Sequence, residues 1–327
     1  MPPSIPEIEA GTTPAPAADS TPAARRGWRD YALLLALACC WSSTYPLTKI
    51  GLGSIPPITF ISARSLIAAL FLIVILYARG MRLPADPKAW KLFAQQQTIN
   101  STLPFLMITW AQQYVAAAPT VLLASTTPIF AFLITWRITR HEPATLLKLA
   151  GSVLGLAGTA AIIGLDSLGG LGSDIFPEIV ILLATISLAC ATIFGLRLND
   201  YDPMVVAAGS LLFGGLLLLP VALVVDHPWT LQPTPEALAA TVSMGIFSSA
   251  FGLMLFYMCL GRLGTLTTNA QGYLRIPIGV GLSVLLLGES VPSNLALGLV
   301  LVMAGVAAMT VSGDQMRRAM QRLRGWL

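Results

Sequence analysis

The chain has 327 residues, of which 55% are hydrophobic and only 10% are charged, and its formal net charge is +4. Soluble domains carry about 25% charged residues, so this composition excludes an ordinary soluble protein. The apolar runs are about 20 residues long, which indicates membrane-spanning helices rather than the shorter alternating strands of a barrel. The sequence predicts an all-α integral membrane protein.

The segment before the first apolar run, residues 1–30, is predicted to be a disordered cytoplasmic tail, because Pro, Ala, Thr and Ser dominate it. Glu7, Glu9 and Asp19 stand where a signal peptide would carry basic residues, so the first span is predicted to be an uncleaved anchor. Residues 314–327 are predicted to form a basic cytoplasmic tail that suits an anionic membrane surface.

Ten apolar segments between the tails are predicted to cross the membrane. They are residues 31–50, 57–78, 92–112, 117–137, 144–164, 175–196, 204–224, 238–261, 266–287 and 292–312. Arg and Lys gather in the tails and in the loops on one side, whereas the opposite side has only Lys49, at the end of the first span. This bias predicts a multi-pass protein of the plasma membrane, the inner membrane in bacteria, with both termini cytoplasmic.

Aromatic and polar residues inside the first four spans are candidates for a substrate site. Trp41 and Tyr45 lie four residues apart on one helix face, which fits either a cavity wall or packing against a neighbouring helix. In the third span Asn100 shares a face with Pro104, and Trp110 follows as a candidate for the apolar wall. Thr126, just before a proline, is the candidate in the fourth span.

The eighth and ninth spans supply the remaining candidates. Tyr257 would add to the aromatic wall, and the ninth span carries Arg275 at membrane depth, which costs roughly 2.5–3.5 kcal/mol. Asn269, Gln271 and Tyr273 precede this arginine on the same helix. Two readings of Arg275 stay open: a structural donor to backbone carbonyls near Pro277, or a bidentate donor to a ligand carboxylate or phosphate.

One further arginine lies within a span. Arg64 is interpreted as structural, because it is nearer the outer end of its helix and its head group can snorkel toward water.

The two halves of the chain resemble each other. Gly151 matches Gly298, and LAGTAA around residue 158 matches MAGVAA around residue 305, both at an offset of 147. The sequence therefore predicts two repeats, residues 31–164 and 165–313. With five spans each, the second repeat is inverted, which places the site between the halves and predicts alternating access. The small residues of both segments fit helix packing either within one protomer or in a homodimer.

Several segments resemble the EamA-type drug/metabolite transporter superfamily. They are WSSTYPLTKIGL at 41–52, PPITFISARSLIAALFL at 56–72, RHEP at 140–143 and LLLGES at 285–290. The resemblance implies a central cavity lined by helices 1, 3, 4, 6, 8 and 9, with helices 5 and 10 as scaffold. It also implies export of small metabolites. Arg275 departs from the family pattern, which places apolar or small residues before that proline.

The sequence predicts a secondary transporter that exports small metabolites, most of all amino acids or related amphipathic acids and zwitterions. Its expected partners are a small-molecule substrate and the lipid bilayer, with no nucleic acid, metal or cofactor. The alternative within transport is efflux of lipophilic cations; a non-transporting membrane scaffold or an intramembrane enzyme are the alternatives of another class. No nucleophile–base constellation appears, so an enzyme is not expected. The spans also lack a central Asp or Glu, so strong proton or sodium coupling is not expected.

Overall fold

The computed structural model describes residues 28–111, 114–115, 117–140, 144–164, 171–172, 175–287 and 294–310. Every regular element in this part of the chain is helical, as the sequence predicts. The α-helices are α1 Trp28–Ser42, α2 Thr44–Gly51, α3 Pro57–Ala78, α4 Pro87–Gln97, α5 Leu103–Ala111, α6 Ala117–Ala124, α7 Thr127–Ile134, α8 Leu146–Ile163, α9 Ile175–Phe194, α10 Pro203–Val225, α11 Pro235–Ser243, α12 Gly252–Leu263, α13 Thr265–Asn269, α14 Gln271–Leu287 and α15 Leu295–Thr310. The predicted tails lie outside the described residues, except that α1 includes residues 28–30.

Several helices begin where a capping residue is followed by proline. The Asp86 and Asp202 carboxylates accept hydrogen bonds from the backbone N–H of Lys88 and Met204 and thereby cap α4 and α10. Proline at the first helical position has no N–H to leave unpaired, and its φ is already helical. Thr234 caps α11 in the same way. These local signals explain why the helices start within a few residues of the predicted boundaries.

Within the described residues, six helices are long and apolar enough to cross a membrane. They are Pro57–Ala78, Thr120–Thr139, Leu146–Ile163, Ile175–Leu198, Pro203–Val225 and Pro235–Leu263. A shorter apolar helix is Leu295–Thr310. The predicted spans at 31–50 and 266–287 are each divided into two helices, and the one at 92–112 is rich in polar residues. The count of ten spans stays a prediction, and those three segments carry most of the candidate site residues.

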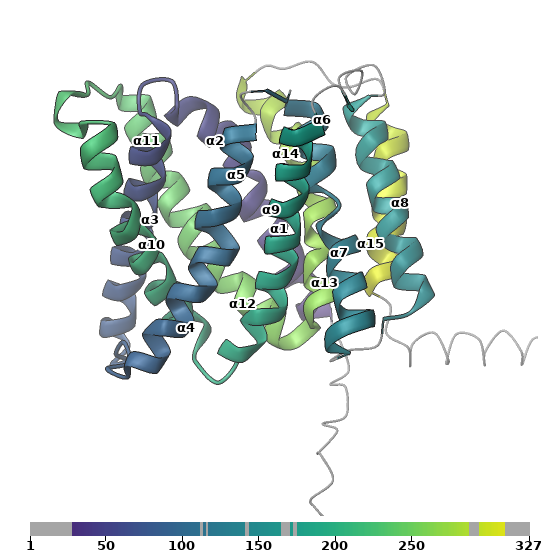
Figure 1. The fold of residues 1–327 in the computed structure, drawn as a ribbon, viewed down its shortest axis with the longest axis horizontal. Helices are drawn as coiled ribbons and strands as arrows, with labels where there is room; N and C mark the ends of the chain where they lie inside the picture. The colour runs from purple at the N-terminus through teal and green to yellow at the C-terminus, as the bar shows by residue number, and fades with distance from the viewer. Residues whose placement is uncertain are drawn as a thin grey trace, which may run out of the picture.

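The helices of the two halves pack on their counterparts at both ends of the molecule. Helix α8 lies beside α15 at one end, and α3 lies beside α10 at the other (Figure 1). In the predicted repeat these pairs are span 5 with span 10 and span 2 with span 7. The centre is also symmetric. Helix α1 packs on α12 and α14 of the second half, and its counterpart α9 packs on α5 and α7 of the first half. Each helix thus contacts the counterparts of the helices that its own counterpart contacts.

The α8–α15 contact is antiparallel and depends on glycine. A Cβ added at Gly151 would lie 2.7 Å from the carbonyl oxygen of Gly305, and one added at Gly158 would lie 2.8 Å from that of Gly298. The offset of 147 converts the first of these pairs into the second. The small-residue faces therefore pack against each other within the protomer, which is one of the two arrangements the sequence allowed.

Wide π-helical turns interrupt two spans at matching positions. One is Thr98–Thr102 between α4 and α5, and the other is Met244–Phe251 between α11 and α12. Adding the repeat offset to the first gives 245–249, which lies inside the second. π-helical turns inside α-helices are frequent at functional sites. Both lie in helices that the family resemblance places around the cavity.

Candidate functional site

The candidate site lies where α1 meets α12 and α14. Trp41, near the end of α1, stacks on Phe256 with ring centroids 5.5 Å apart and an interplanar angle of 30°. One turn earlier on α12, Gly252 allows the indole to approach, because a Cβ there would lie 2.6 Å from Trp41 Nε1. The chain thus holds this large aromatic ring at the contact between its two halves.

Arg275 reaches the same tryptophan from α14. Its guanidinium carbon lies 5.3 Å from the centroid of the Trp41 ring, which is within the range of a cation–π interaction. Ser42, the neighbour of Trp41, donates a hydrogen bond from Oγ to the Arg275 carbonyl oxygen at 3.0 Å. The structure therefore brings together Trp41 and Arg275, which lie in opposite halves of the sequence. Arg275 remains half-buried.

The residues before Arg275 differ in what they contact. Asn269 is buried, and its amide is engaged at both ends: Nδ2 donates to the Thr265 carbonyl at 3.0 Å, and Oδ1 accepts from Thr192 at 3.3 Å. Gln271 is 6% exposed, and its Oε1 accepts no hydrogen bond from the described residues. Gln271 Oε1 therefore has hydrogen-bonding capacity left for a ligand, as does the buried hydroxyl of Thr268.

Tyr273 packs against α8 in this structure. Its side chain is 0% exposed, its ring covers Gly155 on α8, and its hydroxyl donates to the Ser152 carbonyl oxygen at 2.8 Å. These contacts favour a packing role, and a contact of Tyr273 with substrate stays a prediction. Tyr273 and Arg275 are two residues apart and point to different sides of α14, so one joins the scaffold and the other the centre.

Tyr257 lies in the core and not on an open wall. It is 5% exposed, and its hydroxyl lies beside Ser210 and Gln96, yet none of these three polar groups completes a hydrogen bond within the described structure. These neighbours are polar, and the predicted place of Tyr257 in an aromatic wall stays a prediction.

Two more candidates lie at the irregular turns. Thr126 is half-buried at the break between α6 and α7, and its hydroxyl donates to the Leu123 carbonyl at 2.6 Å. Asn100 is half-buried within the π-helical turn Thr98–Thr102. The contacts of these two residues do not link them to Trp41 or Arg275, so their part in the site stays a prediction.

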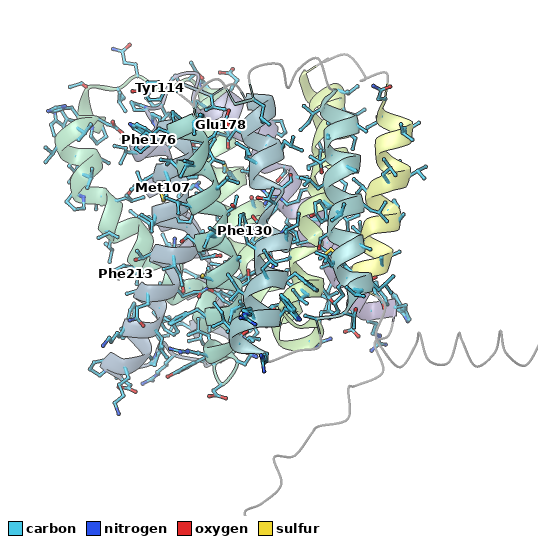
Figure 2. All side chains as sticks on the ribbon, turned by 45° about the vertical axis from the view of Figure 1, so that its right-hand side comes forward. Met107, Tyr114, Phe130, Phe176, Glu178 and Phe213 are labelled. Atoms are coloured by element: carbon cyan, nitrogen blue, oxygen red, sulfur yellow. The ribbon has the colours of Figure 1, made fainter. Side chains whose placement is uncertain are left out.

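Trp110 lies in an aromatic cluster at the rim of the bundle. It is 37% exposed, and its ring centroid is 5.1 Å from that of Tyr114 and 5.8 Å from that of Phe176. Figure 2 shows Tyr114 and Phe176 near one end of the molecule. Such a cluster is typical of the aromatic belt at the membrane–water interface. The Tyr45 side chain lies outside the described part of the structure.

Arg64 makes its contacts within the bundle. Its Nη1 donates to Ser249 Oγ at 3.3 Å, and its guanidinium carbon lies 5.9 Å from the Phe105 ring centroid. Ser249 belongs to the second π-helical turn, and Phe105 belongs to α5. Arg64 is the eighth residue of α3, roughly 10 Å from its start, so it lies in the half of the helix where the sequence placed it, and its structural role stays a prediction.

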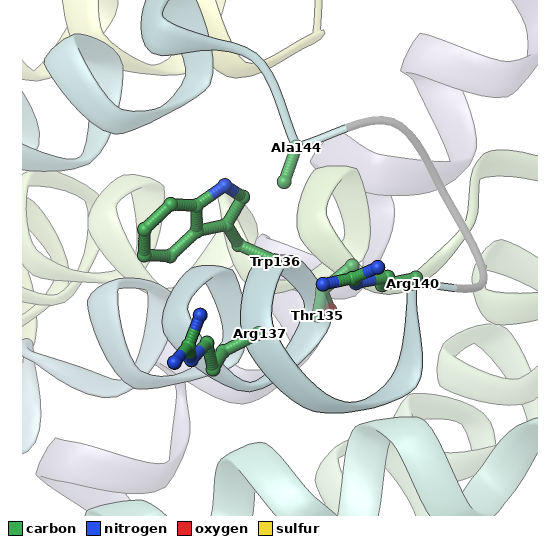
Figure 3. A pocket seen from close by; sticks show the side chains of 5 residues that line it. All are labelled: Thr135, Trp136, Arg137, Arg140 and Ala144. Atoms are coloured by element: carbon green, nitrogen blue, oxygen red, sulfur yellow. The ribbon is translucent and has the colours of Figure 1, made fainter.

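Two open hollows on the described surface lie away from this centre. One, of about 300 Å³, is lined by Thr135, Trp136, Arg137, Arg140 and Ala144 (Figure 3). The other, of about 370 Å³, is lined by Trp28, Arg29, Ala32, Leu33, Met258 and Arg262. Both combine tryptophan with arginine, as expected where a membrane protein meets the lipid head groups.

Comparison with known proteins supports this architecture. The EamA-like transporter family profile matches residues 28–164 and again residues 175–311. The uncharacterized transporter YoaV of Bacillus subtilis is 24% identical over 84% of this chain and 94% of its own length. The uncharacterized inner membrane transporter YedA of Escherichia coli K12 is 26% identical, and the match covers 83% of this chain and 87% of YedA.

Two further likenesses are of interest. A protein of Streptantibioticus cattleyicolor, described as a probable terminal-alkyne amino-acid exporter, is 24% identical over 84% of this chain and 91% of its own length. A solved crystal structure has the same fold, with a TM-score of 0.75 and 19% identity, and the match covers 87% of this chain and 97% of that one. With two profile matches that span most of its length, the chain belongs to the EamA-like transporter family.

Proposed function

We propose that this membrane transporter exports amphipathic organic acids or zwitterions, amino acids first among them, through a central site at Trp41 and Arg275. The observation that carries the proposal is the guanidinium of Arg275 held 5.3 Å from the Trp41 ring at the contact between the two halves. The tryptophan supplies an apolar face, and the arginine supplies a fork of donors that fits a carboxylate.

Three further observations support the proposal. Gln271 keeps a buried amide oxygen without a hydrogen bond, which suits the ammonium group of a zwitterion. Each helix of the first half makes the same kind of contacts as its counterpart in the second half, which fits an inverted repeat with a site at its interface. The relative from Streptantibioticus cattleyicolor is described as a probable exporter of an amino acid.

The test is uptake of labelled amino acids and organic acids into proteoliposomes by the wild type and by Arg275→Gln. Loss of a charged hydrogen bond to the substrate costs about 1.5–3 kcal/mol, so we expect uptake of acids and zwitterions to fall by roughly 10- to 100-fold. Arg197→Gln is the matched control, because Arg197 is exposed and contacts Phe194 at the surface. Unchanged uptake in Arg275→Gln contradicts the proposal.

The same panel separates the alternatives. A transporter of lipophilic cations should move cations faster after Arg275→Gln, because the change removes a repelling charge from the path. A scaffold or an intramembrane enzyme should move no member of the panel in any variant.

A further inference from the structure

Arg64 is a second arginine in the interior that the proposed site leaves unused. Its Nη1 donates to Ser249, its guanidinium faces the Phe105 ring, and its buried Nε has no hydrogen-bond acceptor among the described residues. Within that part of the chain no carboxylate pairs with it: the described ion pair joins Arg262 to Asp30. The contacts that hold this cation are all neutral.

A guanidinium in this setting is costly. Moving a charge out of water costs several kcal/mol, and a hydroxyl with an aromatic face returns only part of this. A purely structural arginine in a core is normally paired with a carboxylate, since the pair neutralises both groups. An anionic ligand that enters between α5 and the Ser249 turn would supply the missing charge.

Arg64 and Arg275 are both linked to the place where the second π-helical turn continues into α12. Arg64 contacts Ser249, and Trp41, which carries Arg275 on its ring, contacts Gly252 three residues further on. Ser249 lies near the end of the π-helical turn Met244–Phe251, and Gly252 is the first residue of α12. Both arginines are therefore linked to the stretch Ser249–Gly252, Arg64 by its hydrogen bond to Ser249 and Arg275 through the Trp41 ring.

We infer that Arg64 and Arg275 together bind a ligand with two acid groups, so that the substrates of this transporter are short-chain dicarboxylates, acidic amino acids included. One carboxylate takes the Arg275 fork and the other takes Nη1 and Nε of Arg64, while the carbon chain between them spans the Ser249–Gly252 turn. This inference rests on the proposed function, because it adds a second anion-binding group to the same central site.

The test compares glutamate with glutamine, which have the same size and differ by one acid group. In proteoliposomes we expect the wild type to take up glutamate in preference to glutamine. Arg64→Gln should lower glutamate uptake at least about 10-fold and leave glutamine uptake within about twofold. Arg64→Lys should retain part of the preference, because it keeps the charge and loses the fork. Arg275→Gln should lower uptake of both.

A structural role for Arg64 would lower both uptakes together, so the glutamate-to-glutamine ratio is the informative readout. Melting temperatures without ligand show whether Arg64→Gln folds; if it does not, the ratio measured for Arg64→Lys decides. An unchanged ratio in the folded variants overturns the inference, and the effect of Arg275→Gln on glutamine still supports the proposed function. If no member of the panel is taken up by the wild type, both fail.

Discussion

Tyr273 shows how surroundings decide the role of a polar residue inside this bundle. A Cβ added at Gly155 would lie 2.5 Å from its ring, and its hydroxyl reaches the Ser152 carbonyl oxygen. A buried hydroxyl left without a partner costs about 1–3 kcal/mol, whereas a paired one is slightly favourable. Tyr273 therefore ties α14 to α8.

Tyr273→Phe is expected to lower the free energy of unfolding by roughly 0.5–1.5 kcal/mol through loss of this hydrogen bond, and to leave transport intact. The melting temperature of the purified protein and uptake into proteoliposomes measure the two effects. Tyr257→Phe is the matched control, because the Tyr257 hydroxyl completes no hydrogen bond in the described structure. A larger loss of stability in Tyr257→Phe than in Tyr273→Phe would contradict this assignment.

At the scale of single residues, the sequence allowed a partial prediction of the site. Depth and neighbours pointed to Trp41 and Arg275, and the structure puts these two side chains together. Helix periodicity gives the direction of a side chain but not the identity of the helix that it meets. For that reason the contacts of Tyr273 with α8 and of Arg64 with Ser249 could not be predicted from the sequence.

The paired elements α8 and α15 carry the clearest trace of the repeat. At Gly305 an added Cβ would lie 2.6 Å from both the Gly151 carbonyl oxygen and the Gly155 backbone nitrogen. Backbone atoms cannot move aside as a flexible side chain can, so the two helices would have to separate. The close approach of α8 and α15 thus depends on glycine at this crossing.

Gly305→Ala is expected to destabilise the protein by about 1–3 kcal/mol, the usual cost of forcing extra atoms into a packed interface. Gly281→Ala, in α14, is the control: no atom lies within 4 Å of a Cβ added there, and alanine favours a helix more than glycine does. Melting temperatures of the two variants make the comparison. A fall for Gly281→Ala equal to that for Gly305→Ala would show that the α8–α15 crossing is not tight.

The elements themselves were predicted better than their irregularities. Runs of apolar residues located most helices, because length and hydropathy are visible in a sequence. The break at Thr126 and the π-helical turns, Thr135–Thr139 included, were not predicted. A π-helical turn adds one residue to a helix without changing its mean hydropathy, so a hydropathy pattern carries no sign of it.

On the scale of the whole molecule, charged residues mark one end of the helix bundle. The Arg262–Asp30 pair, 3.7 Å apart, joins the end of α12 to the start of α1 and so places both at one end. The hollow at Trp28, Arg29 and Arg262 belongs to this end as well. Arginine and lysine are retained on the cytoplasmic side of membrane proteins, so this end is expected to face the cytoplasm.

Single cysteines test this orientation in a background in which Cys39, Cys40, Cys190 and Cys259 are replaced. Ala85 and Thr230 are both exposed, in the connections after α3 and after α10, and these helices pack antiparallel in the predicted repeat. We expect a membrane-impermeant maleimide to label Thr230→Cys in intact cells and Ala85→Cys only after the membrane is opened. The reverse pattern would mean that the bundle is inserted the other way round, and labelling of both sites in intact cells would contradict a span between them.

The labelling result also decides at which end of the transport path Arg64 lies. With the expected orientation Arg64 lies in the outer half, so an exported acid meets Arg275 before it meets Arg64.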